Sequence, residues 1–164
     1  MNENEDITRN KVRLIAQGYF KYWKIDFEET YAPMTRLEAI RILFVFAISQ
    51  SIKLFQMDVK SLFLNGYIKE EVYVEQPPNF EDHKYPNHVF KLNKALYRLK
   101  QTPRTGYECL SSFLLHNNFK RDKVGTTLFI KNTNSDMIIV QIYVDDIVFS
   151  ATNLILCKEL EQLM

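Results

Sequence analysis

The sequence predicts a mixed domain of strands and helices, because the two kinds of hydrophobic period alternate along its 164 residues. Residues 36–50 carry apolar side chains at spacings of three and four, the pattern of an amphipathic helix. Residues 137–149 are almost wholly apolar around an Asp-Asp pair, which predicts two buried strands joined by a turn. With 46% hydrophobic residues and a formal net charge of +1, the composition excludes an acidic tail protein, a histone-like polycation and a mostly disordered chain.

The first half of the chain alternates strand, helix and strand. Thr35 and Glu38 have the Thr-x-x-Glu spacing of a capping box at the start of the predicted helix. The second strand ends at a carboxylate, Asp58, and is followed by an Asn-Gly turn. The predicted elements are a strand at 11–20, a helix at 36–50, a strand at 53–60 and a turn at 65–66.

The second half begins with short strands around a proline-containing loop and ends in a helix. Prolines at 77, 78 and 86 break any regular element between the two short strands. The predicted elements are strands at 72–74 and 88–92, a helix at 107–118, strands at 126–131 and 137–144, a continuation at 147–149 and a helix at 154–164.

The two cysteines and the N-terminus bear on the cellular compartment. Cys109 and Cys157 have no Cys-x-x-Cys or Cys/His spacing, so the sequence favours free thiols in a reducing compartment. The first residues do not have the basic and apolar regions of a signal peptide, and no stretch reaches the ~18 apolar residues of a membrane span. We therefore expect a cytoplasmic or nuclear protein that is not secreted and has no membrane partner.

Three aspartates are the candidate site. An unpaired charge inside an apolar run is destabilising by several kcal/mol, so Asp145 and Asp146 need a compensating partner. Both can address one site only if the backbone turns there, and Asp58 at the end of another strand completes the ligands that two Mg²⁺ about 3.5–4 Å apart need. The alternative is a polar turn in which aspartate serves only backbone hydrogen bonding.

Motifs in a fixed order resemble one family. Residues 143–146, Tyr-Val-Asp-Asp, resemble the Tyr-x-Asp-Asp signature of reverse transcriptases, and residues 56–66 resemble the first-aspartate motif of copia-type (Ty/copia) retrotransposon reverse transcriptases. Further matches follow in family order at residues 11–18, 25–33, 71–78 and 96–104.

The resemblance implies an α+β fold, namely the fingers and partial palm of a right-hand polymerase, with a ferredoxin-like palm sheet that has helices on one face. It assigns residues 9–164 to the fingers and palm of a Pol polyprotein, in a truncated, plant-like copy, and leaves residues 1–8 as an unmatched tail. The thumb and the RNase H domain would be absent, so we expect weak or no processive synthesis.

The resemblance also implies roles for individual residues in nucleotidyl transfer to a primer 3′-OH. Asp58, Asp145 and Asp146 would be catalytic and, with the backbone carbonyl of Val59, would hold two Mg²⁺, with Mn²⁺ as the alternative ion. The implied partners are an RNA or DNA template with its primer, a dNTP and the remainder of the Pol polyprotein. The nucleotide-binding residues would be Lys11 and Arg13 on the triphosphate, Phe63 against a ribose 2′-OH, and Gln101 in the nucleotide pocket.

Residues 91–104 contain five cations and no acid. This density, interleaved with apolar and aromatic residues, suits contact with template or primer phosphates, and a solvated basic face explains it equally well. The five cations are Lys91, Lys94, Arg98, Lys100 and Arg104.

The same segment departs from the family motif. Arg98 stands where the motif usually has glycine, Thr105 where it has alanine, and Gly106 where it has tryptophan.

Three hypotheses for function follow. The first is an RNA-directed DNA polymerase. The second is a non-catalytic nucleic-acid-binding remnant of a degenerate element, and the third treats the aspartates as structural turn residues.

Overall fold

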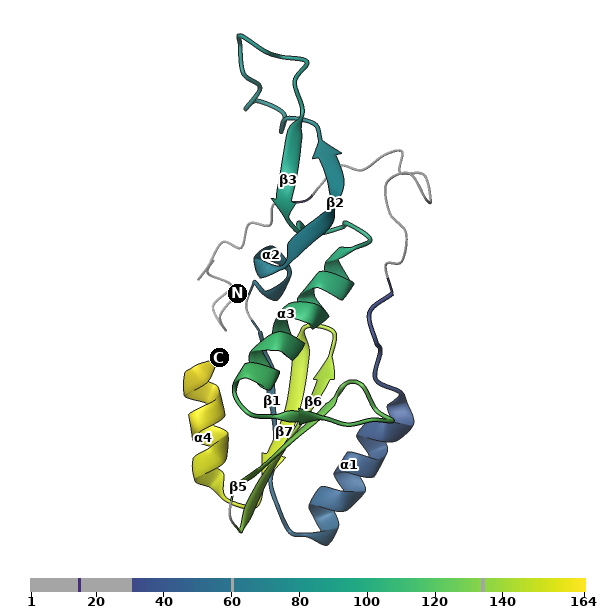
Figure 1. The fold of residues 1–164 in the computed structure, drawn as a ribbon, viewed down its shortest axis with the longest axis vertical. Coiled ribbons are helices and arrows are strands. Elements are labelled where there is room, and N and C mark those ends of the chain that lie inside the picture. The colour runs from purple at the N-terminus through teal and green to yellow at the C-terminus, as the bar shows by residue number, and fades with distance from the viewer. Residues whose placement is uncertain (1–14, 16–30, 60, 134) are drawn as a thin grey trace, which may run out of the picture.

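Two antiparallel sheets of unequal size organise the chain (Figure 1). The structure is a computed structural model, and it describes residue 15 and residues 31–59, 61–133 and 135–164. The larger, main sheet has the strand order β1-β7-β6-β5-β4, and the smaller one pairs β2 with β3 to form the upper hairpin. The strands of the main sheet are β1 (Leu54–Asp58), β4 (Lys120–Arg121), β5 (Leu128–Thr133), β6 (Asp136–Tyr143) and β7 (Asp146–Ala151), and those of the upper hairpin are β2 (Tyr67–Val74) and β3 (Phe90–Lys94).

Two helices cover one face of the main sheet. Leu114 of α3 (Thr102–His116) and Leu160 of α4 (Leu154–Leu163) are buried in one cluster with Val140 of β6 and Phe149 of β7. Full burial of an aliphatic or aromatic side chain of this size stabilises the fold by about 1.5–3 kcal/mol. The mixed helix and sheet architecture, with these two helices on one face, confirms the prediction at that level.

The upper hairpin has an apolar cluster of its own. Val72 of β2 and Leu99, in the turn before α3, are buried together, and Ile68, Leu92 and Leu96 pack against them. The hairpin extends beyond the end of the main sheet, and the loop between its strands lies at its far end (Figure 1). The main sheet and the upper hairpin thus have separate hydrophobic cores.

The predicted helix at 36–50 is present as α1 (Leu37–Ser49), but the predicted capping box is wrong. Arg36 is the N-cap residue, and it makes no side-chain capping hydrogen bond. The Thr35 hydroxyl instead donates to the backbone carbonyl of Ile142 and accepts a hydrogen bond of 2.8 Å from Gln141. Tertiary hydrogen bonds therefore use the oxygen that a local cap would need.

Element boundaries differ from the sequence prediction where apolar periodicity gives no signal. Helix α3 begins at Thr102 rather than at 107. Pro103 is compatible with the first turn of this helix, because the N–H that proline lacks would have no intrahelical acceptor at that position. A single helical turn, α2 (Leu62–Asn65), ends at Asn65, and Gly66 follows in an extended conformation, so the turn predicted at 65–66 is wrong. Strand β4 was not predicted. The predicted strand at 11–20 lies outside the described residues except for Ile15, which forms an isolated parallel bridge with Tyr97. No helix among the described residues is long and apolar enough to cross a membrane.

Candidate active site

A tight turn carries the Asp-Asp pair between β6 and β7. Tyr143 lies opposite Asp146, so Val144 and Asp145 are the two central residues of the hairpin loop. Val144 has φ 58°, and a positive φ at the first central position alone is the pattern of a type II′ turn, which usually has glycine there. Holding a β-branched residue in this conformation stores strain on the order of 1–2 kcal/mol. The turn that was predicted to redirect the two carboxylates is therefore present, and it is strained.

Strand pairing brings the first aspartate to the same place. Asp58, the last residue of β1, lies directly opposite Asp146, the first residue of β7. Side chains at directly opposed positions of antiparallel strands share a face, with Cβ atoms about 4.5–5.5 Å apart. The next residue, Val59, donates its N–H to the backbone carbonyl of Asp145 at 3.0 Å. Three aspartates from two distant segments thus meet at one end of the main sheet.

A side-chain amide orients one of the carboxylates. Gln56, two residues before Asp58 on β1, donates from Nε2 to Oδ1 of Asp146 at 3.3 Å. Within the residues that the structure describes, no three or more His, Cys, Asp or Glu side chains lie close enough together to hold a metal ion. The backbone therefore assembles the aspartates, while their carboxylates do not converge as a set of three.

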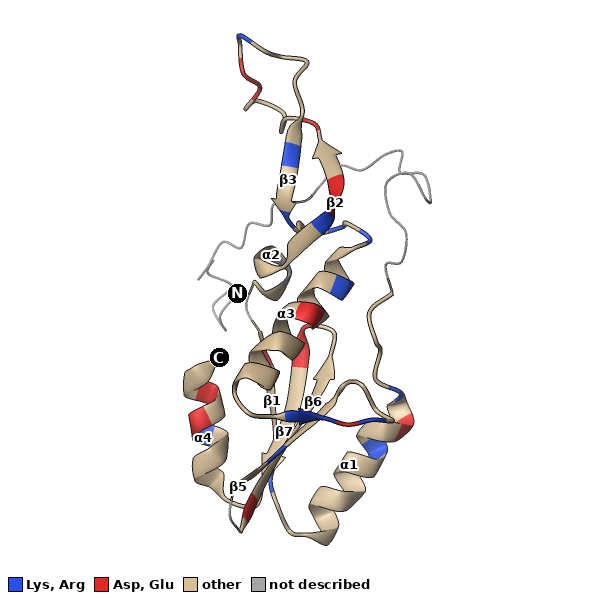
Figure 2. Ribbon diagram, viewed as in Figure 1, with Lys and Arg blue, Asp and Glu red and all other residues tan. Residues whose placement is uncertain are grey.

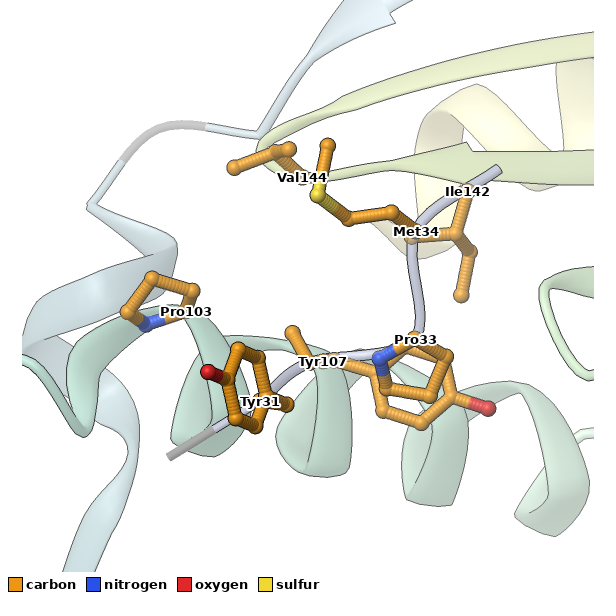
Figure 3. A pocket seen from close by; sticks show the side chains of 8 residues that line it. Tyr31, Pro33, Met34, Pro103, Tyr107, Ile142 and Val144 are labelled. Carbon is orange, nitrogen blue, oxygen red and sulfur yellow. The ribbon is translucent and has the colours of Figure 1, made fainter. Parts of the chain in front are cut away.

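An apolar pocket of about 240 Å³ lies beside the turn (Figure 3). Val144 and Ile142 line it from the hairpin, Pro103 and Tyr107 from α3, and Tyr31 to Met34 from the segment before α1. The Tyr107 hydroxyl donates to the carbonyl of Thr126 at 2.6 Å, so its polar end is satisfied. Apolar walls lower the local dielectric constant and strengthen charge interactions at the neighbouring aspartates.

A buried polar network holds the strand that leads into the turn. Gln141 of β6 is 2% exposed and donates from Nε2 to the hydroxyls of Thr35 at 2.8 Å and Thr127 at 2.7 Å. The N–H of Ile142 donates to the Thr127 carbonyl at 2.9 Å. Sequence reasoning missed both Gln141 and Gln56. The signal for Gln141 was one amide inside an otherwise apolar run.

The predicted nucleotide-binding residues are only partly described. Gln101 is fully buried at the N-cap position of α3. Phe63 belongs to α2, and its side chain lies outside the described part of the structure. Lys11 and Arg13 lie outside the described residues as well. Ile15, which is described, forms its bridge with Tyr97 in the turn that precedes Gln101.

Among the residues that the structure describes, carboxylates lie beside Lys91 and Arg104 of the predicted phosphate-binding cations. Lys91 forms an ion pair with Glu71 across the upper hairpin. The Lys91 ammonium also donates a hydrogen bond to the Glu71 carboxylate, which holds the pKa of Glu71 below its ordinary value and raises the pKa of Lys91. Arg104 forms an ion pair with Glu70 of β2, and its Nε lies 3.7 Å from Glu108. Figure 2 shows both signs of charge where β2 and β3 meet the start of α3.

The other three cations of the segment are exposed. Lys94 places its ammonium 5.3 Å from the centroid of the Tyr67 ring. Arg98 has φ 70°, the left-handed backbone conformation that favours the glycine of the family motif. Lys100 lies two residues before α3 begins. Contact of all five cations with nucleic acid stays a prediction.

Comparison with known proteins agrees with the motif order. The family described as "Reverse transcriptase (RNA-dependent DNA polymerase)" matches residues 1–164. The chain is 37% identical over 157 residues to the Retrovirus-related Pol polyprotein from transposon RE2 of Arabidopsis thaliana, a match that covers 96% of the chain and 11% of that protein. It is 38% identical over 152 residues to the corresponding polyprotein from transposon RE1 of Arabidopsis thaliana, covering 93% of the chain and 10% of that protein.

A third relative extends the match to another plant. The chain is 36% identical over 141 residues to the Retrovirus-related Pol polyprotein from transposon TNT 1-94 of Nicotiana tabacum, covering 85% of the chain and 11% of that protein. No solved structure gives a significant match. The chain spans about a tenth of the length of these relatives. The resemblance to the copia type is confirmed by these plant polyproteins, and the chain belongs to the reverse transcriptase family of retrotransposon Pol polyproteins.

Proposed function

We propose that this chain supplies the nucleotidyl-transfer centre of an RNA-directed DNA polymerase, which joins a dNTP to the 3′-OH of a primer on an RNA or DNA template. The observation that carries the proposal is the pairing of Asp58 with Asp146 beside the strained turn that holds Asp145. Strain in a turn persists only where the surrounding structure enforces it, and such turns cluster at functional sites.

The donor atoms at this end of the sheet fit a divalent cation. Carboxylate and carbonyl oxygens are the ligands that Mg²⁺ prefers, and Asp58, Asp145, Asp146 and the carbonyl of Val59 would hold two such ions. Because the described carboxylates do not form a set of three, binding requires side-chain rotation on the fixed backbone. When bound, the ions would supply charge neutralisation at the attacking and leaving oxygens.

The remaining residues would position the reactants. Gln56 donates a hydrogen bond to the Asp146 carboxylate, and the network of Gln141 with Thr35 and Thr127 fixes the strand behind the turn. In this assignment the main sheet with α3 and α4 is the palm, and the upper hairpin belongs to the fingers. Positioning of this kind lowers the barrier because the reactants are held in an attack geometry before the chemical step.

The proposal is tested by single-nucleotide incorporation with the 164-residue chain on a primed RNA template. Asp145→Asn removes one proposed metal ligand at nearly constant volume. Glu159→Gln removes an exposed carboxylate of α4 that lies beside Ile138, at the other end of β6 from the turn. We expect Mg²⁺-dependent incorporation that Asp145→Asn abolishes and Glu159→Gln retains.

The same assay separates the competing hypotheses. Incorporation that persists in Asp145→Asn contradicts the proposed site. Binding to the primed template that weakens with salt, without extension at any Mg²⁺ concentration, supports instead the non-catalytic remnant.

A further inference from the structure

The junction between the upper hairpin and helix α3 contains an alternating set of charged side chains. Arg104 of α3 pairs with Glu70 of β2, and Lys69 of β2 lies 3.3 Å from Glu108 of α3. Arg104 also lies 3.7 Å from Glu108, one helical turn away. We call these four residues, Lys69, Glu70, Arg104 and Glu108, the clamp.

The clamp crosses a junction that the hydrophobic cores do not cross. One core joins α3 and α4 to the main sheet, and the other, centred on Val72 and Leu99, belongs to the hairpin. A backbone hydrogen bond also lies at this junction: the N–H of Ala95, after β3, donates to the carbonyl of Gly66, before β2, at 2.9 Å. The two clusters share no residue, and the ion pairs of the clamp cross from the hairpin to α3.

Burial distinguishes one pair of the clamp, Arg104 with Glu70, from an ordinary surface ion pair. The side chains of Arg104 and Glu70 are 17% and 21% exposed, whereas those of the neighbouring pair Lys91 and Glu71 are 50% and 67% exposed. Exposed pairs contribute only about 0–1 kcal/mol, and salt screens a less solvated pair less. Loss of one partner from such a pair leaves the other charge desolvated and unpaired, which favours a reorientation of the hairpin that exposes this charge to water.

Close packing supports the same joint. A Cβ added at Gly66 would lie 2.6 Å from the Cβ of Thr105, so the chain before β2 touches α3 one residue after Arg104. The register of β2 against β3 is irregular between Tyr67 and Val72, which allows the consecutive residues Lys69 and Glu70 both to reach α3.

We propose that Arg104 is a positioning residue, which fixes the orientation of the upper hairpin on α3 through its ion pair with Glu70, beside the pair of Lys69 with Glu108. This inference rests on the proposed function in one respect: as part of the fingers, the hairpin must keep its position relative to the aspartates. The contacts themselves hold whether or not the chain catalyses incorporation.

The test measures the distance between the two parts directly. Spin labels at Phe90→Cys on β3 and Lys158→Cys on α4 report the hairpin and the main sheet, and both positions are exposed. Cys109→Ser removes a partly exposed native thiol, and buried Cys157 is retained. Pulsed electron paramagnetic resonance on the full chain then gives the distribution of distances between the labels.

Two adjacent glutamates provide the matched comparison. Glu70→Gln breaks the contact between hairpin and helix, and Glu71→Gln breaks a contact within the hairpin with the same change of charge. We expect a single narrow distribution in the parent chain and in Glu71→Gln, a broadened or shifted one in Glu70→Gln and Arg104→Gln, and partial recovery in Arg104→Lys, which keeps the charge.

An unchanged distribution in Glu70→Gln and Arg104→Gln overturns the proposal, as does equal broadening in Glu71→Gln. Glu108→Gln removes a more exposed member of the clamp and serves as the milder variant if Glu70→Gln does not fold. Because the measurement needs neither metal nor substrate, failure of this inference is distinguishable from failure of the proposed polymerase activity.

Discussion

Replacement of Arg98 by glycine is expected to stabilise the protein. Arg98 has φ 70° at the third position of the turn from Leu96 to Leu99, which the 3.3 Å hydrogen bond between the Leu99 N–H and the Leu96 carbonyl closes. This is the type II pattern, in which glycine avoids the steric conflict of Cβ. A non-glycine residue in the left-handed region loses about 1–2 kcal/mol, and the greater freedom of glycine in the unfolded chain returns about 0.4–1 kcal/mol of that. The net expected gain in unfolding free energy is about 0.5–1 kcal/mol.

Urea denaturation followed by circular dichroism measures this gain. For an m value of about 2 kcal/mol/M, the midpoint should rise by about 0.25–0.5 M, and the melting temperature by about 1–4 °C. Arg98→Ala is the control, because it removes the same charge but keeps Cβ, and it should give no such gain. Lys123→Gly, at an exposed loop position without a positive φ, should be destabilising. Equal stability of Arg98→Gly and Arg98→Ala would show that the backbone conformation at Arg98 is not strained.

Three further predictions concern charged groups and a thiol. The N–H groups of Gly125 and Val124 donate to the Asp122 carboxylate at 2.8 Å and 3.1 Å and hold the pKa of Asp122 below its ordinary value of 3.8. The stability that the ionised carboxylate adds is therefore present above pH 3.8 and is lost as the pH falls through the lowered pKa. The urea midpoint of Asp122→Asn should lack this acid dependence. Burial raises the pKa of Cys157, so iodoacetamide should alkylate it more slowly than Cys109 near pH 8, and equal rates by mass spectrometry would contradict the burial. Lys94→Ala should weaken binding to a primed template, and flatten the salt dependence of binding, more than Lys91→Ala does, because the Lys91 ammonium is already paired with Glu71. Equal changes in filter binding would count against a phosphate contact at Lys94.

Local sequence signals predicted several elements but not always which side chains they bury: α1 buries Leu43 and Ala47, whereas Phe44 and Ile48 are exposed. The helix that became α1 and the hairpin of β6 and β7 were found because their apolar residues recur at the helix or strand period. The start of α3 was missed because its first turns, around Pro103 and Gly106, bring no apolar repeat. The two-residue strand β4 is too short to show a period at all.

Features that depend on contacts between distant residues were beyond the sequence. Thr35 had the spacing of a cap, and only the fold shows that its hydroxyl is bound to Gln141 and Ile142 instead. The positive charge of residues 91–104 was evident, yet the pairing of Arg104 with Glu70 depends on how β2 crosses α3. By contrast, Asp58 and Asp146 could be predicted as neighbours, because strand ends and motif order both pointed to them.

The central claim is that the paired aspartates bind divalent cations. Titration of the ¹⁵N-labelled chain with Mn²⁺, followed by paramagnetic broadening of amide signals, tests it in solution without requiring catalysis. We expect the first signals to broaden to be those of Asp58, Val59, Asp145 and Asp146, and we expect Asp58→Asn to remove this effect. Broadening that begins instead at the exposed carboxylates Glu81 and Asp82 of the hairpin loop, or that is unchanged in Asp58→Asn, would contradict it.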